Sequence, residues 1–477
     1  MIYHLIHAEV LAGLATIADD SVDAVITDPP YGLGFMGKEW DTFRPENVTR
    51  EMKRDTRTQK RRELYGGRES DAPSPAMAAA RYDRSATANR AFQAWCETWA
   101  RECLRVLKPG GYILSFGGSR TYHRMASGIE DAGFEVRDQL QWIFGSGFPK
   151  SLDVSKAVDR HLGAEPRVVG ARKKLQSYGK GAVFGGMPEK DGLQQITEAT
   201  TTAGAALKGW GTALKPAHEP IVLARKPFRG TVAANVLQHG TGAMNIDGCR
   251  IDGAPDPASW TAQRSAVDTS DGRMGQKAAN VAAMNAGLIE PPSGRWPANV
   301  LLDEEAAAML DEQSGELTSG LFTGKRAADK LRNTYGAFAG TDETETYGDS
   351  GGASRFFYTA KASRSEREEG LYGDEGEYEH SGPRGHALNG DGTPRPRPRQ
   401  NSHPTVKPFD VMRWLVRLIT PTGGHVLDPF VGSGTTGMAA IAEGFDFTGI
   451  DREAEYIGIS RRRIASVAPL LAKEKTA

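Results

Sequence analysis

Two short motifs at opposite ends of the chain each follow a stretch with apolar character. Asp28-Pro29-Pro30-Tyr31 follows Val22 to Ile26, and a glycine-rich motif that begins at Asp428 follows Val426 and Leu427. In open α/β sheets, ligands bind in the loops that leave the carboxyl ends of parallel strands. The sequence therefore predicts two ligand-binding loops that come from sequence-distant strands.

Helix-like and strand-like segments alternate near the amino terminus. Helices are expected at Glu9 to Ile17, at the segment around Trp95 to Val106, and at Tyr122 to Ala132, with strands at Val22 to Ile26, Tyr112 to Phe116 and Glu135 to Phe144. Lys108-Pro-Gly-Gly111 is a typical helix stop. This alternation predicts a parallel sheet with helices on both faces.

The pattern becomes irregular and rich in Gly, Ser, Thr and Pro between about residues 149 and 401, with islands of order at Pro220 to Ala224, Trp296 to Leu302 and Phe356 to Lys361. Order returns at Pro408, and a strand, a helix, a strand and a helix follow. We expect two halves of one α/β domain at 1–150 and 401–477, with 151–400 as a large irregular insertion into a sheet that is complete without it.

Composition narrows the class of protein. The chain is 39% hydrophobic and 25% charged, which is ordinary for a globular protein, and its longest apolar runs are too short to span a membrane. We expect a soluble, cytoplasmic protein with no membrane contact. Its three cysteines fit neither a disulfide framework nor a four-cysteine zinc site, and no metal site is expected. The net charge of −1 does not indicate a nucleic-acid partner, so any such surface must come from local basic stretches.

The carboxyl-terminal motif has the features of a cofactor-binding loop. Gly432 and Gly434 allow a tight turn and a close approach of the backbone to a ligand. Asp451 ends the next strand, where a carboxylate can accept hydrogen bonds from ribose hydroxyls. Asp428 precedes the glycine turn and would repel a phosphate, but it suits a cationic amine such as the one in the methionine portion of S-adenosylmethionine. A glycine turn that only connects a strand to a helix is the simpler alternative.

The amino-terminal motif has the groups that methyl transfer to an exocyclic amine requires. Asp28 can accept a hydrogen bond from the amine, the backbone carbonyl of Pro29 or Pro30 can hold its other hydrogen, and Tyr31 can stack on the ring. Two consecutive prolines also make the loop rigid. A surface turn is the alternative for this motif alone, and the distal glycine motif makes it much less favoured.

Together these motifs resemble motifs IV and I of the S-adenosylmethionine-dependent DNA amino-methyltransferases, whose sheet is Rossmann-like. Their order, with Asp-Pro-Pro-Tyr first, is similar to the circularly permuted beta group, which includes cell-cycle-regulated bacterial adenine methyltransferases; motifs in the middle of the chain resemble phage and prophage enzymes. The segment from His403 to Pro408 and the segment from Leu104 to Gly111 also match the family. Ala8-Glu9 departs from the usual Gly-Asp of the family, and Glu9 can still accept from an adenine amine. The resemblance implies the following cofactor-binding residues: Glu9, His403, Thr405, Lys407, Asp428, Phe430, Gly432, Ser433, Gly434, Thr435, Thr436 and Asp451.

The resemblance implies an enzyme that methylates N6 of a flipped-out adenine in double-stranded DNA, with Asp28 to Tyr31 as the catalytic residues. N4-cytosine methylation uses the same geometry, although Asp before Pro-Pro-Tyr favours adenine. C5-cytosine chemistry is disfavoured because no Pro-Cys pair is present, and protein and RNA amino-methyltransferases usually place the glycine motif first. A catalytically silent DNA-binding protein of a mobile element is the alternative from another class.

DNA contacts are expected from basic stretches and from the insertion. Lys60, Arg61, Arg62, Arg225 and Lys226 are the candidates for phosphate binding. The insertion is expected to hold the target-recognition elements, and the protein is expected to form a homodimer, as members of the beta group often do.

Overall fold

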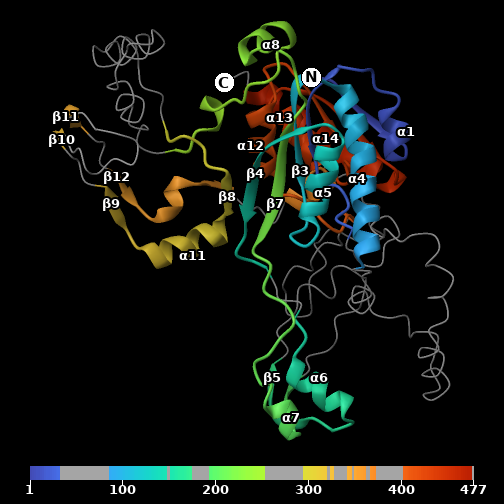
Figure 1. The fold of residues 1–477 in the computed structure, drawn as a ribbon, viewed down its shortest axis with the longest axis vertical. Coiled ribbons are helices and arrows are strands. Elements are labelled where there is room, and N and C mark those ends of the chain that lie inside the picture. The colour runs from blue at the N-terminus through green and yellow to red at the C-terminus, as the bar shows by residue number, and fades with distance from the viewer. Residues whose placement is uncertain are drawn as a thin grey trace, which may run out of the picture.

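A central sheet of nine strands organises the structure, a computed structural model that describes residues 1–32, 85–147, 151–173, 193–252, 294–319, 323–326, 341–345, 349–360, 366–371 and 401–474. The strand order is β1-β15-β14-β2-β3-β7-β4-β8-β13. Figure 1 labels β3, β4, β7 and β8 of this sheet. The strands are β1 Tyr3–His7, β2 Val22–Thr27, β3 Leu107–Phe116, β4 Glu135–Ile143, β7 His218–Arg225, β8 Val300–Asp303, β13 Tyr358–Ala360, β14 His425–Asp428 and β15 Asp446–Asp451. Neighbouring strands run parallel, except that β7 is antiparallel to both β3 and β4.

Helices cover both faces of the sheet, as the sequence predicts. One layer contains α1 (Val10–Leu14), α4 (Ala86–Val106) and α5 (Tyr122–Asp131), and the other contains α12 (Phe409–Ile419), α13 (Thr435–Ala442) and α14 (Ala454–Glu474). Fully buried side chains of β2 serve both layers: Ile26 belongs to the core under α12 and α13, and Val25 belongs to the core under α4. The predicted α/β architecture is therefore confirmed.

Two element boundaries differ from the sequence prediction. Helix α1 ends at Leu14, before the expected Ile17. Strand β3 begins at Leu107, although Lys108-Pro-Gly-Gly111 was expected to separate a helix from a strand starting at Tyr112. Gly110 permits this extension because its φ is +83°, and a Cβ there would come within 2.4 Å of Asn235 Nδ2.

The antiparallel strand β7 corrects the prediction of an all-parallel sheet. Strand β4 ends at Ile143, and β7 begins beside it, with His218 opposite Ile143. The chain between them leaves and re-enters the sheet at the same edge, so the returning strand has to run in the opposite direction. The alternation pattern does not contain this information because the excursion interrupts it.

The prediction that the sheet is complete without residues 151–400 is also wrong. Strands β7, β8 and β13 come from this segment and, together with β4, form the side of the sheet beyond β3. All three fall within or overlap the islands of order in the sequence. Short apolar runs between polar stretches indicate strands, but they do not indicate which sheet the strands join.

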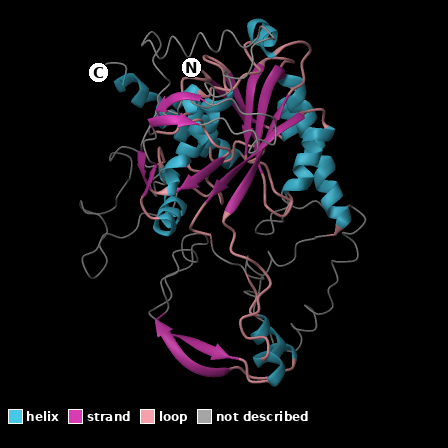
Figure 2. Ribbon diagram, turned by 60° about the vertical axis from the view of Figure 1, so that its left-hand side comes forward, coloured by secondary structure: helices cyan, strands magenta, loops and turns pink. Residues whose placement is uncertain are grey.

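The other described helices and strands of this segment lie outside the sheet. A projecting unit extends from the lower ends of β4 and β7 (Figure 2); it contains α6 Val154–His161, β5 Arg167–Lys173, β6 Leu193–Glu198 and α7 Thr202–Ala205. Helix α8 Val232–His239 follows β7, and α11 Glu304–Ser314 follows β8. Two small antiparallel ladders pair β9 Leu317–Ser319 with β12 Asp349–Gly351 and β10 Thr323–Arg326 with β11 Thr341–Glu345.

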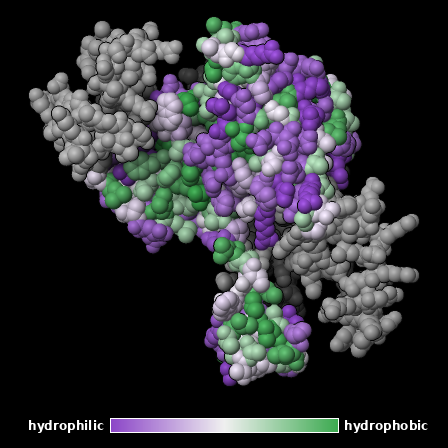
Figure 3. All heavy atoms as spheres, in the orientation of Figure 1, coloured by the Kyte–Doolittle hydropathy of each residue, from purple (hydrophilic) through white to green (hydrophobic). Residues whose placement is uncertain are grey.

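Several large apolar side chains are exposed on the projecting unit, where Figure 3 shows a green surface. They are Leu152, Leu162, Val168, Val169, Ile196, Trp210 and Leu214. Among the helices of the described residues, none combines the length and apolar character that crossing a membrane requires.

Candidate active site

The two motifs identified in the sequence lie side by side. Strand β14 pairs directly with β2, with Leu427 opposite Val25. Because both strands are parallel, the loops that follow them emerge at one edge of the sheet, here called the catalytic edge. The hydroxyl of Thr27 donates to Asp428 Oδ1 over 2.7 Å, and this bond joins the two loops.

Asp428 is held by internal hydrogen bonds. It is 2% exposed, and its Oδ2 accepts from the hydroxyl of Thr436 at 2.6 Å, while its Oδ1 also accepts from Phe430 N at 3.0 Å. Burial raises the pKa of the Asp428 carboxyl to about 6, against the lowering effect of these bonds. The carboxylate thus anchors the glycine turn, and its contact with a cofactor amine stays a prediction.

The glycine turn has the backbone geometry that only glycine adopts easily. Gly432 and Gly434 have φ angles of +50° and +82°. A Cβ on Gly432 would lie 2.7 Å from His403 Nε2, and one on Gly434 would lie 2.9 Å from the Cα of Ser460. Protein atoms therefore approach the turn closely on both sides, and the approach of its backbone to a ligand stays a prediction.

His403 is placed against this turn as a neutral ring. Burial lowers the pKa of His403 to about 4, and a hydrogen bond with the Thr405 carbonyl opposes that shift. The ring packs edge-on against Tyr456, with centroids 4.6 Å apart. His403 thus lies directly against the glycine turn, and its contact with a cofactor stays a prediction.

Asp451 and Glu9 have local partners. Asp451 Oδ2 accepts from Gly432 N at 3.0 Å and its Oδ1 accepts from Glu453 N at 2.9 Å. Glu9 is exposed at the amino end of α1, and its carboxylate accepts from Leu11 N at 2.8 Å. Both acids lie at the ends of neighbouring strands, β15 and β1. Cofactor contacts for these two carboxylates stay predictions.

Phe430 also has a packing role. Its ring meets those of Trp95 and Trp99 at centroid distances of 5.5 Å each. Trp99 is fully buried, and Trp95 is partly buried against the same core. The aromatic cluster fixes the loop after β14 against α4.

A small pocket of about 30 Å³ lies between the two loops. It is lined by Asp28, His403, Thr405, Lys407, Met412, Asp428, Phe430, Val431, Gly432, Ser433, Thr435 and Thr436. The pocket brings together carboxylates, hydroxyls, an ammonium and apolar walls. These groups fit a ligand that carries positive and negative charges, a ribose and a ring, as S-adenosylmethionine does. The pocket has room for only about one or two water molecules, so lining side chains such as those of His403 and Lys407 have to move to admit such a ligand.

Asp28 belongs to a compact group of charged side chains. Lys407 Nζ donates to Asp28 Oδ2 at 2.7 Å and contacts Glu219 Oε2 at 3.1 Å. The Tyr31 hydroxyl donates to Asp28 Oδ1 at 2.7 Å and lies 3.4 Å from Glu219 Oε2. Thr121 holds the loop from behind by donating to the Tyr31 carbonyl at 2.6 Å.

The electrostatics of this group keep Lys407 charged and Tyr31 neutral. Burial alone would lower the pKa of Lys407, but Asp28 and Glu219 outweigh it and raise that pKa. Burial raises the pKa of Tyr31 well above its usual value, and the same two carboxylates add to the shift. The phenol is therefore a hydrogen-bond donor to Asp28 at physiological pH.

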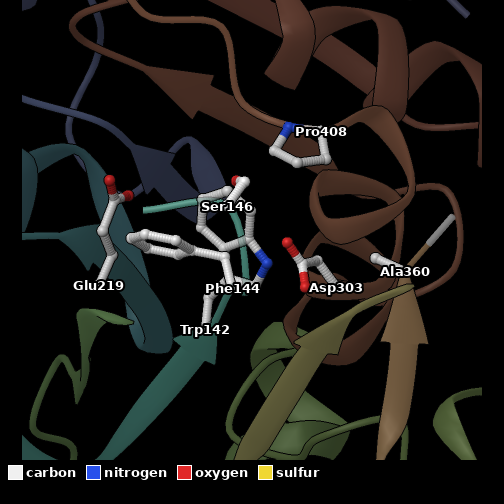
Figure 4. A pocket seen from close by; sticks show the side chains of 7 residues that line it. All are labelled: Trp142, Phe144, Ser146, Glu219, Asp303, Ala360 and Pro408. Atoms are coloured by element: carbon white, nitrogen blue, oxygen red, sulfur yellow. The ribbon is translucent and has the colours of Figure 1, made fainter. Parts of the chain in front are cut away.

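A larger pocket of about 320 Å³ adjoins this group at the catalytic edge (Figure 4). Its lining residues are Trp142, Phe144, Ser146, Glu219, Asp303, Ala360 and Pro408. Figure 4 shows the aromatic rings of Trp142 and Phe144 on one side and the Asp303 carboxylate opposite. The buried indole nitrogen Nε1 of Trp142 has no hydrogen-bond partner among the described residues.

Sequence reasoning missed two residues of the site. Glu219 was not among the predicted site residues, yet it is the second residue of β7 and its carboxylate contacts Lys407. Arg463 of α14 is fully buried, and its guanidinium donates to the carbonyl and hydroxyl of Ser433 at 2.6 and 3.1 Å. In the sequence, the signal for a buried Arg463 was its place on a helix beside Ile464 and four residues before Val467, both of which are buried.

The basic residues predicted to bind DNA do not lie at the candidate active site in the described part of the chain. Arg225 pairs with Glu135 at 2.7 Å, and Lys226 pairs with Asp20 at 2.6 Å. Arg225 is the last residue of β7 and Lys226 follows it, at the end of the strand that lies away from Glu219. The positive charge of each side chain is paired with a carboxylate of the protein itself. The predicted DNA-binding role of Arg225 and Lys226 is therefore not supported by this geometry. Lys60, Arg61 and Arg62 lie outside the described residues.

A mostly parallel sheet with two loops at adjacent strand ends defines an α/β fold of the kind that binds ligands at that edge. The chain belongs to the DNA methylase family of N6- and N4-methyltransferases, which it matches over residues 22–462. It is therefore a DNA methyltransferase, and the methyl donor of the family is S-adenosylmethionine, as the sequence predicts.

Individual proteins show the same relationship. The Type II methyltransferase M.HindIII of Haemophilus influenzae is 24% identical over 281 residues, which are 57% of this chain and 71% of that protein. M2.DpnII of Streptococcus pneumoniae is 48% identical over 62 residues, which are 13% of this chain and 23% of that protein. Two solved structures, an M1.HpyAVI–SAM complex and the cytosine-N4-specific PvuII DNA methyltransferase, align with TM-scores of 0.32 and 0.37 at 12% and 11% identity. The alignments cover 97% of this chain and 100% of the first, and 99% of this chain and 93% of the second. Similarity this low carries no functional assignment, which rests on the family match.

Proposed function

We propose that this DNA methyltransferase transfers a methyl group from S-adenosylmethionine to N6 of an adenine flipped out of double-stranded DNA. The observation that carries the proposal is the Thr27–Asp428 hydrogen bond, which joins the Asp28 loop to the glycine turn. A methyl donor at one loop and an amine at the other are then neighbours, as direct transfer requires. The Asp before Pro-Pro-Tyr favours adenine over cytosine by resemblance.

Asp28 and Tyr31 prepare the amine for attack. A carboxylate oxygen of Asp28 accepts one hydrogen of the amine, and the Pro29 or Pro30 carbonyl accepts the other. These bonds direct the nitrogen lone pair away from the ring and towards the methyl donor. The Tyr31 ring stacks on the base and offsets part of the cost of unstacking it from the duplex.

The larger pocket is the proposed position of the flipped base. Its volume of about 320 Å³ is ample for a purine, and Glu219 links it to the Asp28 group. The rings of Trp142 and Phe144, 5.3 Å apart, offer an apolar wall. The unpartnered Nε1 of Trp142 is a donor, and a purine ring nitrogen is an acceptor of the kind it lacks.

The proposed donor site is the glycine turn and the residues that surround it. When bound, S-adenosylmethionine supplies an electrophilic methyl group on sulfur. The residues proposed to hold it are Glu9, His403, Thr405, Lys407, Asp428, Phe430, Gly432, Ser433, Gly434, Thr435, Thr436 and Asp451. Arg463 fixes the Ser433 carbonyl and the Thr435 hydroxyl from below and so positions the turn.

We further propose that residues 151–400 carry target recognition and that the enzyme acts as a homodimer. The projecting unit extends from the catalytic edge (Figure 1), so DNA at Asp28 would pass close to it. Its exposed apolar surface suits contact with a second chain better than contact with water.

Replacing the projecting unit by that of a relative is expected to change the methylated sequence and to leave the methylated atom unchanged. Neutralising Lys60, Arg61 and Arg62 together is expected to weaken binding to all sequences and to flatten its salt dependence.

The direct experiment is methyl transfer to unmethylated DNA followed by mass spectrometry of the nucleosides. N6-methyladenine is the expected product. N4-methylcytosine would show the same geometry acting on the other amine, and the absence of both would refute the proposal. Light scattering of the free protein and of its DNA complex tests the dimer, and a monomer in both states would exclude it.

A further inference from the structure

Lys407 occupies the place where the substrate amine has to bind. Its ammonium is 2.7 Å from Asp28 Oδ2, and the Tyr31 hydroxyl is bonded to Asp28 Oδ1. Each oxygen of the proposed amine acceptor therefore already has an internal donor. The Lys407 side chain is only 8% exposed, so the ammonium cannot simply turn out into water.

Displacing a buried ammonium from its carboxylate leaves an unpaired charge, which is strongly unfavourable. The structure contains a second carboxylate that removes this penalty. Glu219 Oε2 lies 3.1 Å from Lys407 Nζ and comes from β7, a different strand from the one that precedes Asp28. The rings of Phe116 and Tyr31, with centroids 4.9 and 5.5 Å from Nζ, also favour a cation at this position.

The charge balance supports an exchange of partners. Asp28 and Glu219 contribute two negative charges and Lys407 one positive charge, so the group has one carboxylate more than its single cation requires. A neutral amine can then take Asp28 while the ammonium keeps Glu219. With Asp28 as the sole carboxylate, the amine and the ammonium would compete for it directly.

We propose that Glu219 is a positioning residue that retains the Lys407 ammonium while the substrate amine displaces it from Asp28. This inference rests on the proposed function, because it takes an amine at Asp28 as the substrate. It assigns Lys407 two positions: on Asp28 in the free enzyme and on Glu219 in the complex with DNA. Glu219 acts through Lys407 and does not itself contact the reacting atoms.

The test replaces Glu219 by glutamine in the full-length enzyme and measures methyl transfer to unmethylated DNA over a range of pH. Glu219→Gln keeps the shape but leaves Asp28 as the one carboxylate partner of Lys407. We expect kcat at pH 7 to fall roughly tenfold or more, since the lost partner is a charged one, with the KM for S-adenosylmethionine nearly unchanged. Loss of one of its two carboxylate partners should lower the pKa of Lys407, so the activity of the variant relative to the wild type should rise with increasing pH.

A double-mutant cycle separates this role from a merely structural one. In a Lys407→Met background no ammonium competes for Asp28, so adding Glu219→Gln should change kcat less than about twofold. Glu219→Asp retains the charge on a shorter side chain and should restore part of the activity, including in the event that Glu219→Gln does not fold. Equal effects of Glu219→Gln in both backgrounds, or wild-type kcat in the single variant, would overturn the inference while leaving the proposed function intact. An inactive wild-type enzyme would overturn both.

Discussion

The hydroxyl of Thr27 and the carboxylate of Asp428 are joined by a buried hydrogen bond of 2.7 Å across 401 positions of sequence. It connects the last residue of β2 with the last residue of β14, and the loops after these strands carry Asp28 and the glycine turn. The distance between the two halves of the site is thus set by the pairing of β2 with β14 and by this hydrogen bond at the ends of the two strands. Several measurable consequences depend on this arrangement.

Thr27→Val should loosen the two loops without changing the volume of the core. The substitution leaves Asp428 Oδ1 with one remaining partner, the Phe430 amide. The expected loss is about 1–3 kcal/mol in the free energy of unfolding, together with weaker binding of S-adenosylmethionine, measured by denaturant titration and calorimetry. Thr98→Val is the matched control, because that hydroxyl bonds a backbone carbonyl within α4 at an exposed site. Equal losses in both variants would contradict the linking role of Thr27.

Asp28→Ala should abolish methyl transfer while preserving donor binding. The variant lacks the acceptor for the amine, and the rate should fall by roughly 10²–10³-fold or more. Calorimetric titration with S-adenosylmethionine should give an affinity close to that of the wild type. Asp247→Ala removes a carboxylate that is 78% exposed and should be silent. Near-normal turnover in Asp28→Ala would exclude this residue from the chemistry.

Tyr31 variants should rank by how much aromatic surface they keep. Tyr31→Trp retains a stacking face and should be more active than Tyr31→Ala, which loses roughly 1–3 kcal/mol of base stacking. Tyr31→Phe removes only the hydroxyl that donates to Asp28. Single-turnover rates with DNA that contains the target site measure the series. If alanine equals tryptophan, the ring does not stack on the base.

Gly434→Val should prevent binding of S-adenosylmethionine. Its backbone has a φ of +82°, and the new side chain would also collide with the backbone of Ser460 at 2.9 Å. Gly444→Val is a close control, since its φ is +88° and no atom lies within 4 Å of the added Cβ. Both variants carry the same backbone strain, and only Gly434→Val should lose the thermal stabilisation that the cofactor confers. Loss of that stabilisation in both would attribute the effect to strain alone.

His403 should make the protein less stable as the pH falls from about 6.5 to 4. The pKa of the folded-state ring is about 4, so in this window the unfolded chain binds a proton that the native protein does not. The free energy of unfolding therefore decreases with falling pH, by at most about 3 kcal/mol because the ring is partly accessible to water. His403→Gln should lack this component. The pKa of Asp428 is raised to about 6, so its contribution to the free energy of unfolding increases as the pH falls. This contribution is the same in the wild type and in His403→Gln, so it cancels when the two proteins are compared. Parallel stability curves for wild type and variant would show that His403 is not buried in the neutral form.

The sequence was sufficient to predict the strands before Asp28 and Asp428 because each is a local apolar run next to a distinctive loop. It did not reveal Glu219, because the importance of that residue depends on Lys407, which lies on a different element 188 positions away. The error for Arg225 has the same origin. Its positive charge is visible in the sequence, but the neutralising partner Glu135 lies on a neighbouring strand, and only the pairing of β4 with β7 brings them together. Local sequence patterns predict individual helices and strands. The direction of β7 depends on the chain between β4 and β7, whose sequence has no local pattern that indicates it.

The strand order also has a consequence for synthesis on the ribosome. Strand β14 lies between β15 and β2, so two of the interior positions of the sheet are filled by residues made after position 424. Until then β2 has a free side, and its buried residues Ala24, Val25 and Ile26 lack the neighbours that cover them in the finished protein. The sheet therefore stays incomplete until most of the chain has been synthesised. During this time β2 has an unpaired edge at which other nascent chains can associate. Premature termination anywhere before β14 leaves a polypeptide without the glycine turn, which is the proposed donor site, so a shortened product should not compete with the complete enzyme for the methyl donor.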